Sequence, residues 1–340
     1  SWLASTFQPH SRLCGAAMYA LVLFLALASG EPRRPLYNIA HMVNSIADLD
    51  NAMKDGANAV ESDVAFSDNG TATRLYHGAP CDCFRECHAE ERVDRFFDYL
   101  RRSTNEYWGP YKNQFTLLFL DLKIEGVDED RKYAAGVDLA QKLILNLWHG
   151  VLPFRTINVL LSIPSVSGKN VLRGAIDTIS SYNSRLLDKL GFSVADNDDV
   201  DSIRDMYQRL GIYQHFWQGD GITNCLSYLC SAERLKRVIK NRDSYGHQHY
   251  VEKVYHWTVD IPEVMRRSIR AGVDAIITNR PRRMSRIMEE DEFSGLVRLA
   301  DLTDSPWERF FGPTLSPGQL TKDAKHLAAE GFDSVLDDAV

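Results

Sequence analysis

The sequence predicts an α/β protein built as an eight-stranded (β/α)8 TIM barrel. Eight apolar, strand-like runs alternate with amphipathic helical stretches over most of the 340 residues. Strands that alternate with helices indicate a parallel sheet, and eight is the number of strands that closes such a barrel. No low-complexity linker divides residues 31–310, and the length suits one barrel of this kind. We therefore expect a single domain over this range.

The expected strands follow one another with polar or helical stretches between them. Residues 131–148 and 261–272 have the clearest amphipathic helical pattern among the connections. A further short strand is expected at "RLYHG", residues 74–78, inside the loop after the second strand. The eight barrel strands are expected at residues 36–43, 57–66, 115–123, 157–164, 190–195, 212–219, 251–260 and 273–279.

Residues 1–30 are expected to be a secretory signal peptide. The apolar run "CGAAMYALVLFLALASG" follows Arg12 and ends in small residues, with cleavage expected just before Glu31. This run is shorter than the roughly 20 apolar residues that a membrane span needs, which favours a leader over an anchor. At the other end, residues 311–340 have some helical pattern and no recognisable motif. That extension is either a surface helix or a loose end.

Composition and cysteine usage agree with a secreted protein. The formal net charge is −7 and no long basic run is present, so nucleic acid is not an expected partner. Five cysteines remain after the leader, in "CDCFREC", residues 81–87, and "CLSYLC", residues 225–230. No histidine cluster at zinc-ligand spacing accompanies them, so disulfides are expected, with one thiol left over. Asn69 begins a glycosylation sequon, "NGT".

Polar residues recur where the expected strands end. In β/α barrels the carboxyl ends of the strands build the active site. Five strands place such residues at the same rim, which chance explains poorly. These residues are His41 on the first strand, Glu61 and Asp63 on the second, Asp121 and Lys123 on the third, Trp257 and Asp260 on the seventh, and Asn279 on the eighth.

Three of these residues are candidate metal ligands. Strand side chains alternate, so Glu61 and Asp63 point to the same side, and Asp121 belongs to the adjacent strand. Three ionised carboxylates repel one another unless a cation binds between them, and an all-oxygen set suits Mg²⁺ best, with Ca²⁺ or Mn²⁺ as alternatives. The competing interpretation is a set of salt bridges on an outer face. The i, i+2 spacing inside apolar strands makes a poor surface pattern, so we favour one Mg²⁺ ion.

Two histidines accompany the carboxylates, His41 and His77 in "YHGAPCDC". Histidine is the usual acid or base near neutral pH, so one ring would attack phosphorus or take a proton while the other protonates a leaving group. Lys123 would offset phosphate charge, or simply pair with Asp121. Trp257 offers an aromatic face to a quaternary ammonium, or packs in the core.

At this point the sequence resembles a known family, the venom sphingomyelinase D or phospholipase D toxins of spiders and ticks. The similarity runs in family order through about residues 33–310, and "LADLTDSPWERF", residues 299–310, resembles the segment that plugs the bottom of the barrel. The matching motifs are "NIAHMVN", "GANAVESDV", "YHGAPCDCFREC", "LLFLDLK", "LLSIPS", "QGDGITNCL", "VYHWTVD" and "GVDAIITNRP".

The resemblance implies a distorted barrel related to glycerophosphodiester phosphodiesterases, with His41 and His77 as the catalytic pair. It assigns Glu61, Asp63 and Asp121 to Mg²⁺. The remaining site positions fall on Lys123, Trp257, Asp260 and Asn279. Family toxins cleave choline from sphingomyelin, and often from lysophosphatidylcholine, by attack of the lipid's own hydroxyl, which leaves a cyclic phosphate.

The family's disulfides imply the pairs Cys81–Cys87 and Cys83–Cys225, and leave Cys230 without a counterpart. We expect a secreted monomer that contacts choline phospholipids at membrane surfaces without spanning them. One alternative is a glycerophosphodiester phosphodiesterase that uses water as the acceptor. Another is a non-catalytic lipid-binding member of the fold, against which the complete set of site residues argues.

Overall fold

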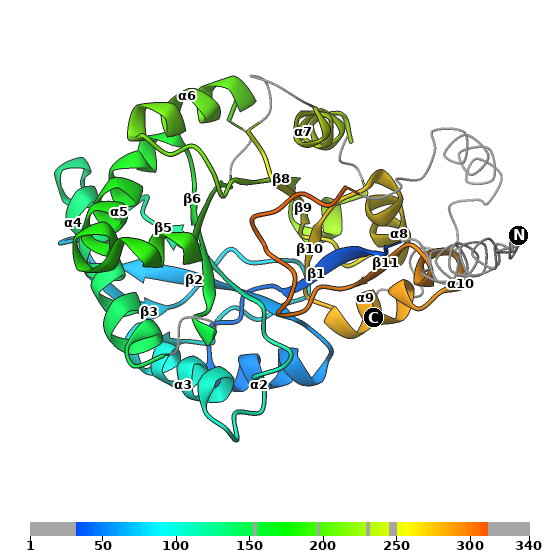
Figure 1. The fold of residues 1–340 in the computed structure, drawn as a ribbon, viewed down its shortest axis with the longest axis horizontal. Helices are drawn as coiled ribbons and strands as arrows, with labels where there is room; N and C mark the ends of the chain where they lie inside the picture. Colours follow the sequence, from blue (N-terminus) through cyan, green and yellow to red (C-terminus); the bar gives the residue numbers. More distant parts are fainter. Residues whose placement is uncertain (1–31, 152–154, 196–197, 229–231, 245–249, 312–340) are drawn as a thin grey trace, which may run out of the picture.

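The computed structural model describes residues 32–311, apart from residues 152–154, 196–197, 229–231 and 245–249. The expected signal peptide, the expected C-terminal extension and Cys230 lie outside the described residues. Within the described range, eight parallel strands form a barrel and helices surround them (Figure 1). The predicted fold class is therefore confirmed.

The barrel strands alternate with helices as the sequence indicates. The strand order around the sheet is β7-β6-β5-β2-β1-β10-β9-β8. A parallel bridge between Phe192 and Phe216 joins its two end strands, so the barrel is nearly closed with a weak seam. The strands are β1 (Arg34–Ala40), β2 (Ala59–Phe66), β5 (Leu117–Lys123), β6 (Asn158–Ile163), β7 (Leu190–Val194), β8 (Trp217–Gly221), β9 (Lys253–Trp257) and β10 (Ala275–Thr278).

Some helices have recognisable caps at their ends. Ser45 caps the first of them, because its side chain accepts the backbone N–H of Asp48. Gly272 ends another at φ 96°, a left-handed conformation that glycine adopts without steric cost. The helices are α2 (Ile46–Lys54), α3 (Val93–Asn105), α4 (Lys132–Lys142), α5 (Lys169–Asn183), α6 (Val200–Leu210), α7 (Glu233–Asp243), α8 (Pro262–Ala271), α9 (Pro281–Met288) and α10 (Asp291–Ser294).

Three observed elements differ from the expectation in detail. Strand β8 begins at Trp217 rather than at residue 212, because the chain reaches the barrel only at the glycine-rich stretch "WQGDG". The expected helix 131–148 is α4 continued by a π-helical segment, Leu143–Trp148. The short extra strand is β3 (Ala72–Leu75), antiparallel to β2, and it pairs in turn with β4 (Glu91–Arg92).

The two ends of the barrel have different covers. We call the carboxyl ends of the strands the rim and their amino ends the base. The base is covered by the segment after α10, where β11 (Val297–Leu299) pairs in parallel with the start of β1. There the indole of Trp217 donates to the Pro306 carbonyl at 2.9 Å, and Asn58 donates to the Ala300 carbonyl at 2.7 Å. The segment therefore lies under the barrel interior and leaves the rim open.

The predicted glycosylation sequon lies on the surface. Asn69 is exposed in the turn before β3, and its side chain accepts hydrogen bonds from Ser67 and Thr71. Among the described residues, no helix combines the length and the apolar character that crossing a membrane requires.

Candidate active site

The strand register brings the three acidic residues of the rim together. Asp63 on β2 is the register partner of Asp121 on β5, and Glu61 lies two residues earlier on the same side of β2. One carboxylate oxygen from each of the three residues lies within 4.8 Å of the others. Glu61 and Asp63 are buried, and Asp121 is partly so. The arrangement is a cluster of negative charge at the barrel mouth.

The hydrogen bonds of these carboxylates hold them in place without neutralising them. Glu61 accepts the backbone N–H of Met42 at 2.7 Å, and Asp63 accepts the amide of Asn44 at 2.7 Å. The ammonium of Lys123 lies 2.5 Å from Asp121 and 2.9 Å from Asp63. The single positive charge of Lys123 therefore does not balance the three carboxylates.

The donor set fits a divalent cation. Burial and the neighbouring Asp63 raise the pKa of Glu61 from 4.5 to about 8, so the cluster lacks positive charge. Oδ1 of Asp63 is buried and has the Lys123 ammonium, at 2.9 Å, as its cationic neighbour among the described residues. Carboxylate oxygens are the ligands that Mg²⁺ and Ca²⁺ prefer. Glu61, Asp63 and Asp121 would hold such an ion.

His41 follows β1 and lies beside this cluster. Its Nδ1 is 3.0 Å from a carboxylate oxygen of Asp82 and 3.1 Å from the side-chain oxygen of Asn279, while its Nε2 is 3.9 Å from Glu61. Burial lowers the pKa of this ring, but the hydrogen bond to Asp82 and the carboxylates of Glu61 and Asp82 outweigh burial and raise it to about 9. A proton on Nδ1 faces Asp82, which leaves Nε2 directed toward the acidic cluster.

Asp82 is a site residue that the sequence did not reveal. It accepts the hydroxyl of Thr223 at 2.9 Å and the amide of Asn279 at 2.7 Å, in addition to facing His41. Burial opposes its ionisation, but His41 and these donors hold its pKa well below the usual range. Its one sequence signal is an acidic residue between two cysteines, in a loop without periodicity. Asp82 therefore orients His41 from a loop distant in sequence.

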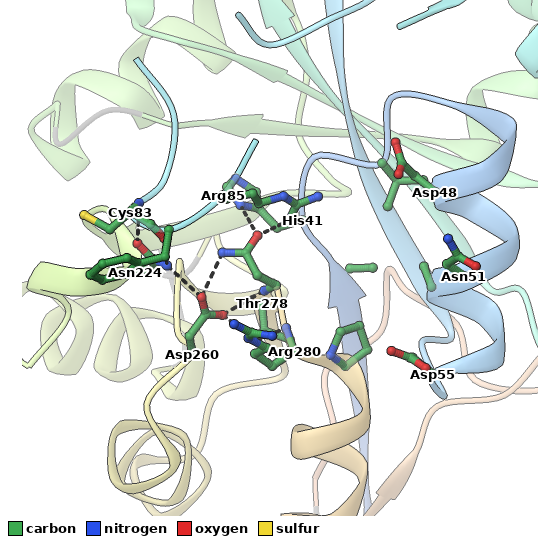
Figure 2. A pocket seen from close by; sticks show the side chains of 16 residues that line it. His41, Asp48, Asn51, Asp55, Cys83, Arg85, Asn224, Asp260, Thr278 and Arg280 are labelled. Carbon is green, nitrogen blue, oxygen red and sulfur yellow. Dashed lines mark hydrogen bonds between the residues drawn. The ribbon is translucent and has the colours of Figure 1, made fainter. Parts of the chain in front are cut away.

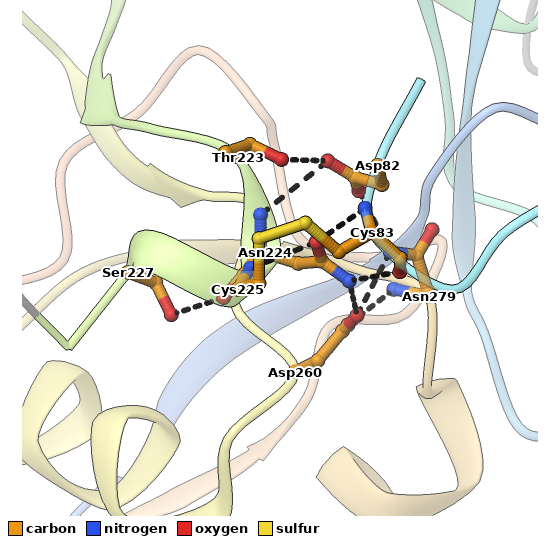
Figure 3. The surroundings of a disulfide bond; sticks show 8 residues. All are labelled: Asp82, Cys83, Thr223, Asn224, Cys225, Ser227, Asp260 and Asn279. Carbon is orange, nitrogen blue, oxygen red and sulfur yellow. Dashed lines mark hydrogen bonds between the residues drawn. A yellow bond between two sulfur atoms is a disulfide. The ribbon is translucent and has the colours of Figure 1, made fainter. Parts of the chain in front are cut away.

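Two disulfides hold that loop over the rim. Cys81 is bonded to Cys87, and Cys83 is bonded to Cys225, 142 residues away. These are the pairs that the family resemblance implies. Figure 3 shows the second bridge beside Asn224, whose side-chain oxygen accepts the backbone N–H of Cys83 at 3.0 Å. The loop that carries Asp82 is thus fixed to the loop after β8.

Asp260 and Asn279 support His41 from behind rather than lining the space in front of it. Asp260 accepts the backbone N–H and the side-chain amide of Asn279, each at 2.8 Å, as well as the amide of Asn224 (Figure 3). Arg85 also donates to Asn279 and to the Met42 carbonyl. Hydrogen bonds with Asp260 and Arg85 therefore orient the Asn279 side chain, whose oxygen contacts His41.

His41 and His77 line one cavity of about 470 Å³ together with Glu61, Asp121 and Lys123. His77 lies in the loop after β3, with Nδ1 2.8 Å from the Gly78 carbonyl. The rest of the wall is mainly apolar or aromatic, and includes Phe119, Tyr255, Trp257 and Ile277. The indole N–H of Trp257 is buried and has no hydrogen-bond partner in the described part of the chain. The same cavity is thus lined by acidic, histidine and apolar side chains.

Comparison with known proteins identifies several similar chains. A family model described as dermonecrotic toxin SPH matches residues 31–307. Dermonecrotic toxin SPH of Ixodes scapularis is 47% identical over 93% of this chain and 88% of its own length. Dermonecrotic toxin LlSicTox-betaIA1 of Loxosceles laeta is 40% identical over 82% of this chain and 90% of its own. Dermonecrotic toxin Hl-PLD1 of Hemiscorpius lepturus is 39% identical, over 92% and 99%.

Solved structures are more distant. A putative glycerophosphoryl diester phosphodiesterase from Silicibacter pomeroyi aligns with 79% of this chain and 97% of its own, at 16% identity and a TM-score of 0.49. That likeness is too remote to inform on activity.

Proposed function

Because the chain belongs to the dermonecrotic toxin SPH family, we propose that it is a secreted, Mg²⁺-dependent phospholipase D of the sphingomyelinase D type. The proposed reaction releases choline from sphingomyelin, and from lysophosphatidylcholine, by attack of the lipid's own hydroxyl on phosphorus. The lipid product is a cyclic phosphate. The observation that carries the proposal is a single cavity that is lined by two histidines, by two members of the carboxylate cluster and by apolar side chains.

Each described residue has a defined part in this proposal. One of His41 and His77 attacks phosphorus or removes the proton of the attacking hydroxyl, and the other protonates the choline oxygen as it leaves. Asp82 keeps Nε2 of His41 directed into the cavity by holding Nδ1 at 3.0 Å. Lys123 reduces the negative charge of the phosphodiester. A bound Mg²⁺ supplies further charge neutralisation as a Lewis acid.

The cavity wall supports a choline lipid as the substrate. Trp257 and Tyr255 offer aromatic faces, which attract quaternary ammonium groups. Apolar side chains such as Phe119 and Ile277 suit the part of a lipid next to its headgroup. We further propose that the mature protein is a secreted monomer that meets membranes only at their surface. The signal-peptide pattern supports secretion.

Phosphorus NMR of sphingomyelin incubated with the purified mature chain, with and without EDTA, tests the proposal. The expected result is a cyclic phosphate signal that EDTA abolishes. A linear phosphomonoester would instead support hydrolysis by water, as in a glycerophosphodiester phosphodiesterase. Absence of turnover on sphingomyelin and on lysophosphatidylcholine would overturn the proposed substrate class and leave a binding role to be tested.

A further inference from the structure

A second cavity lies on the other side of His41 from the active-site cavity. It has a volume of about 280 Å³ and opens between α2, the start of α9 and the disulfide-bonded loop. Figure 2 shows its two sides: Asp48, Asn51 and Asp55 lie along α2, and Arg85 and Arg280 lie across from them. None of the three predicted metal ligands lines it. The cavity is therefore separate from the catalytic cluster although His41 borders both.

Charges of both signs line this cavity, and only Asp55 among its acids is in an ion pair, with Arg282 at 2.5 Å; Asp260 accepts from neutral donors in the described residues. The guanidinium of Arg280 is exposed and makes no hydrogen bond or ion pair with the described residues. Arg85 donates to two neutral oxygens, on Met42 and Asn279, and forms no ion pair with a carboxylate in the described ranges. Across the cavity, Asp48 accepts the hydroxyl of Ser45 at 2.8 Å and likewise has no cationic partner there.

Such a cavity suits a small zwitterion. A ligand with one negative and one positive end can meet the two arginines and the aspartate at once, which a simple anion or cation cannot do. Guanidinium groups bind phosphate well, and a carboxylate attracts an ammonium. At about 280 Å³ the cavity is small for a whole lipid and appropriate for a headgroup.

Phe84 places this cavity toward a membrane surface. Its ring is 89% exposed, and it lines the cavity from the disulfide-bonded loop. Its backbone has φ 60°, a left-handed conformation that bulky residues rarely adopt. An exposed apolar ring beside a polar cavity is the arrangement that anchors a protein at the boundary between headgroups and acyl chains.

We propose that this cavity is a second, non-catalytic binding site for the phosphocholine headgroup of a neighbouring membrane lipid. Arg280 and Arg85 bind its phosphate, Asp48 faces its ammonium, and Phe84 enters the adjacent acyl region. The site holds the active-site cavity against the bilayer while the substrate lipid turns over. The inference rests on the proposed function only in taking the target surface to be one of choline lipids.

The test is partition of the full mature chain onto sphingomyelin–phosphatidylcholine vesicles in EDTA, where no metal-dependent turnover is needed. Arg280→Gln should weaken partition about tenfold, and Asp48→Asn by several-fold. The double variant should be little weaker than Arg280→Gln alone, because both side chains hold one headgroup. Arg286→Gln is the matched control, an exposed arginine on α9 that does not line the cavity, and should change partition less than twofold.

Competition by soluble ligands distinguishes a site for a phosphocholine headgroup from a site for free phosphate. Phosphocholine should compete with vesicle partition of the wild-type chain at concentrations where inorganic phosphate does not. Equal competition by the two would overturn the headgroup assignment and leave a general anion site. Equal partition of Arg280→Gln and Arg286→Gln would overturn the site itself. A chain that partitions as predicted but turns over no lipid would contradict the proposed function and not this inference.

Discussion

The rim and the base of the barrel both bury carboxylates, but the surrounding charges shift the pKa values of these carboxylates in opposite directions. At the rim, Glu61 lies among other carboxylates, and burial with Asp63 raises its pKa to about 8. At the base, Asp274 is equally buried, but it accepts Arg242 at 2.6 Å and the backbone N–H of Val254 at 2.8 Å. Burial would raise the pKa of Asp274 too, yet the cations around it hold it below the usual range.

The difference shows that burial alone does not identify a functional acid. A carboxylate surrounded by cations is part of the framework, because its charge is already compensated. A carboxylate surrounded by carboxylates is left with unmet charge, which is the property of a metal or catalytic site. The same barrel therefore contains a satisfied charge cluster at one end and an unsatisfied one at the other.

The strongest test of this contrast removes the rim's chemistry without affecting the base. His41→Ala and His77→Ala should each lower turnover of sphingomyelin by about 10²–10⁴-fold, because each removes a group that moves a proton or attacks phosphorus. Phosphorus NMR measures the turnover, and the thermal midpoint should stay close to that of the wild type. His88→Ala, an exposed histidine in the same loop, serves as the control. Near-normal turnover in both variants would remove the histidines from the mechanism.

The second test compares one acid from each end. Asp274→Asn should lower the free energy of unfolding by about 3–5 kcal/mol, because Arg242 then keeps only the half-exposed Asp243 as an ion-pair partner among the described residues, and Lys253 and Arg34 lose the same compensating charge. Asp121→Asn should change stability in EDTA only slightly but weaken Mg²⁺ binding at least about tenfold. Even substitutions next to metal ligands reduce metal affinity by about 10–100-fold. Urea unfolding and isothermal titration measure the two quantities. Equal destabilisation by both substitutions would erase the distinction between the ends.

The smallest expected effect sharpens the comparison within the base. Glu252 accepts the backbone N–H of Phe216, but burial raises its pKa from 4.5 to about 7. A raised pKa means that its contribution to stability is complete below pH 4.5 and is lost as the pH rises through about 7. Glu252→Gln should therefore gain about 1–3 kcal/mol over the wild type at pH 8 and nothing at pH 4.

Urea unfolding at both pH values checks the Glu252 prediction. A constant difference between variant and wild type across this range would mean that Glu252 keeps its ordinary pKa. Burial would then have no net effect on the pKa of Glu252, unlike that of Glu61 at the rim.

Much of this organisation follows from the sequence. Alternation of apolar runs with amphipathic stretches predicted the barrel, and the acids at i, i+2 on β2 predicted a cluster facing β5, as the register of Asp63 and Asp121 confirms. The start of β8 could not be located, because "WQGDG" lacks the branched residues that mark a strand. The glycines are needed there, since a Cβ at Gly221 would lie 1.6 Å from the Trp257 carbonyl oxygen.

The support of His41 was harder to foresee. Asp82 contacts it directly, and Arg85 contacts its neighbour Asn279, both from a loop without hydrophobic periodicity. The position of this loop depends on disulfides and on Asn224, which is distant in sequence. Local pattern carries no information about such contacts. The sequence could name the residues of the strand ends and His77, whereas Asp82 and Arg85 required the three-dimensional structure.

The bond between Cys83 and Cys225 also closes a covalent ring of chain. The ring contains Asp121 and Lys123, whereas His41, Glu61, Asp63 and His77 lie on the arm that precedes it. A protease that cuts once between residues 83 and 225 therefore releases no fragment, and both halves of the active site stay in one molecule. For a chain secreted as proposed, and so exposed to extracellular proteases, this disulfide keeps the two pieces covalently joined after one cut.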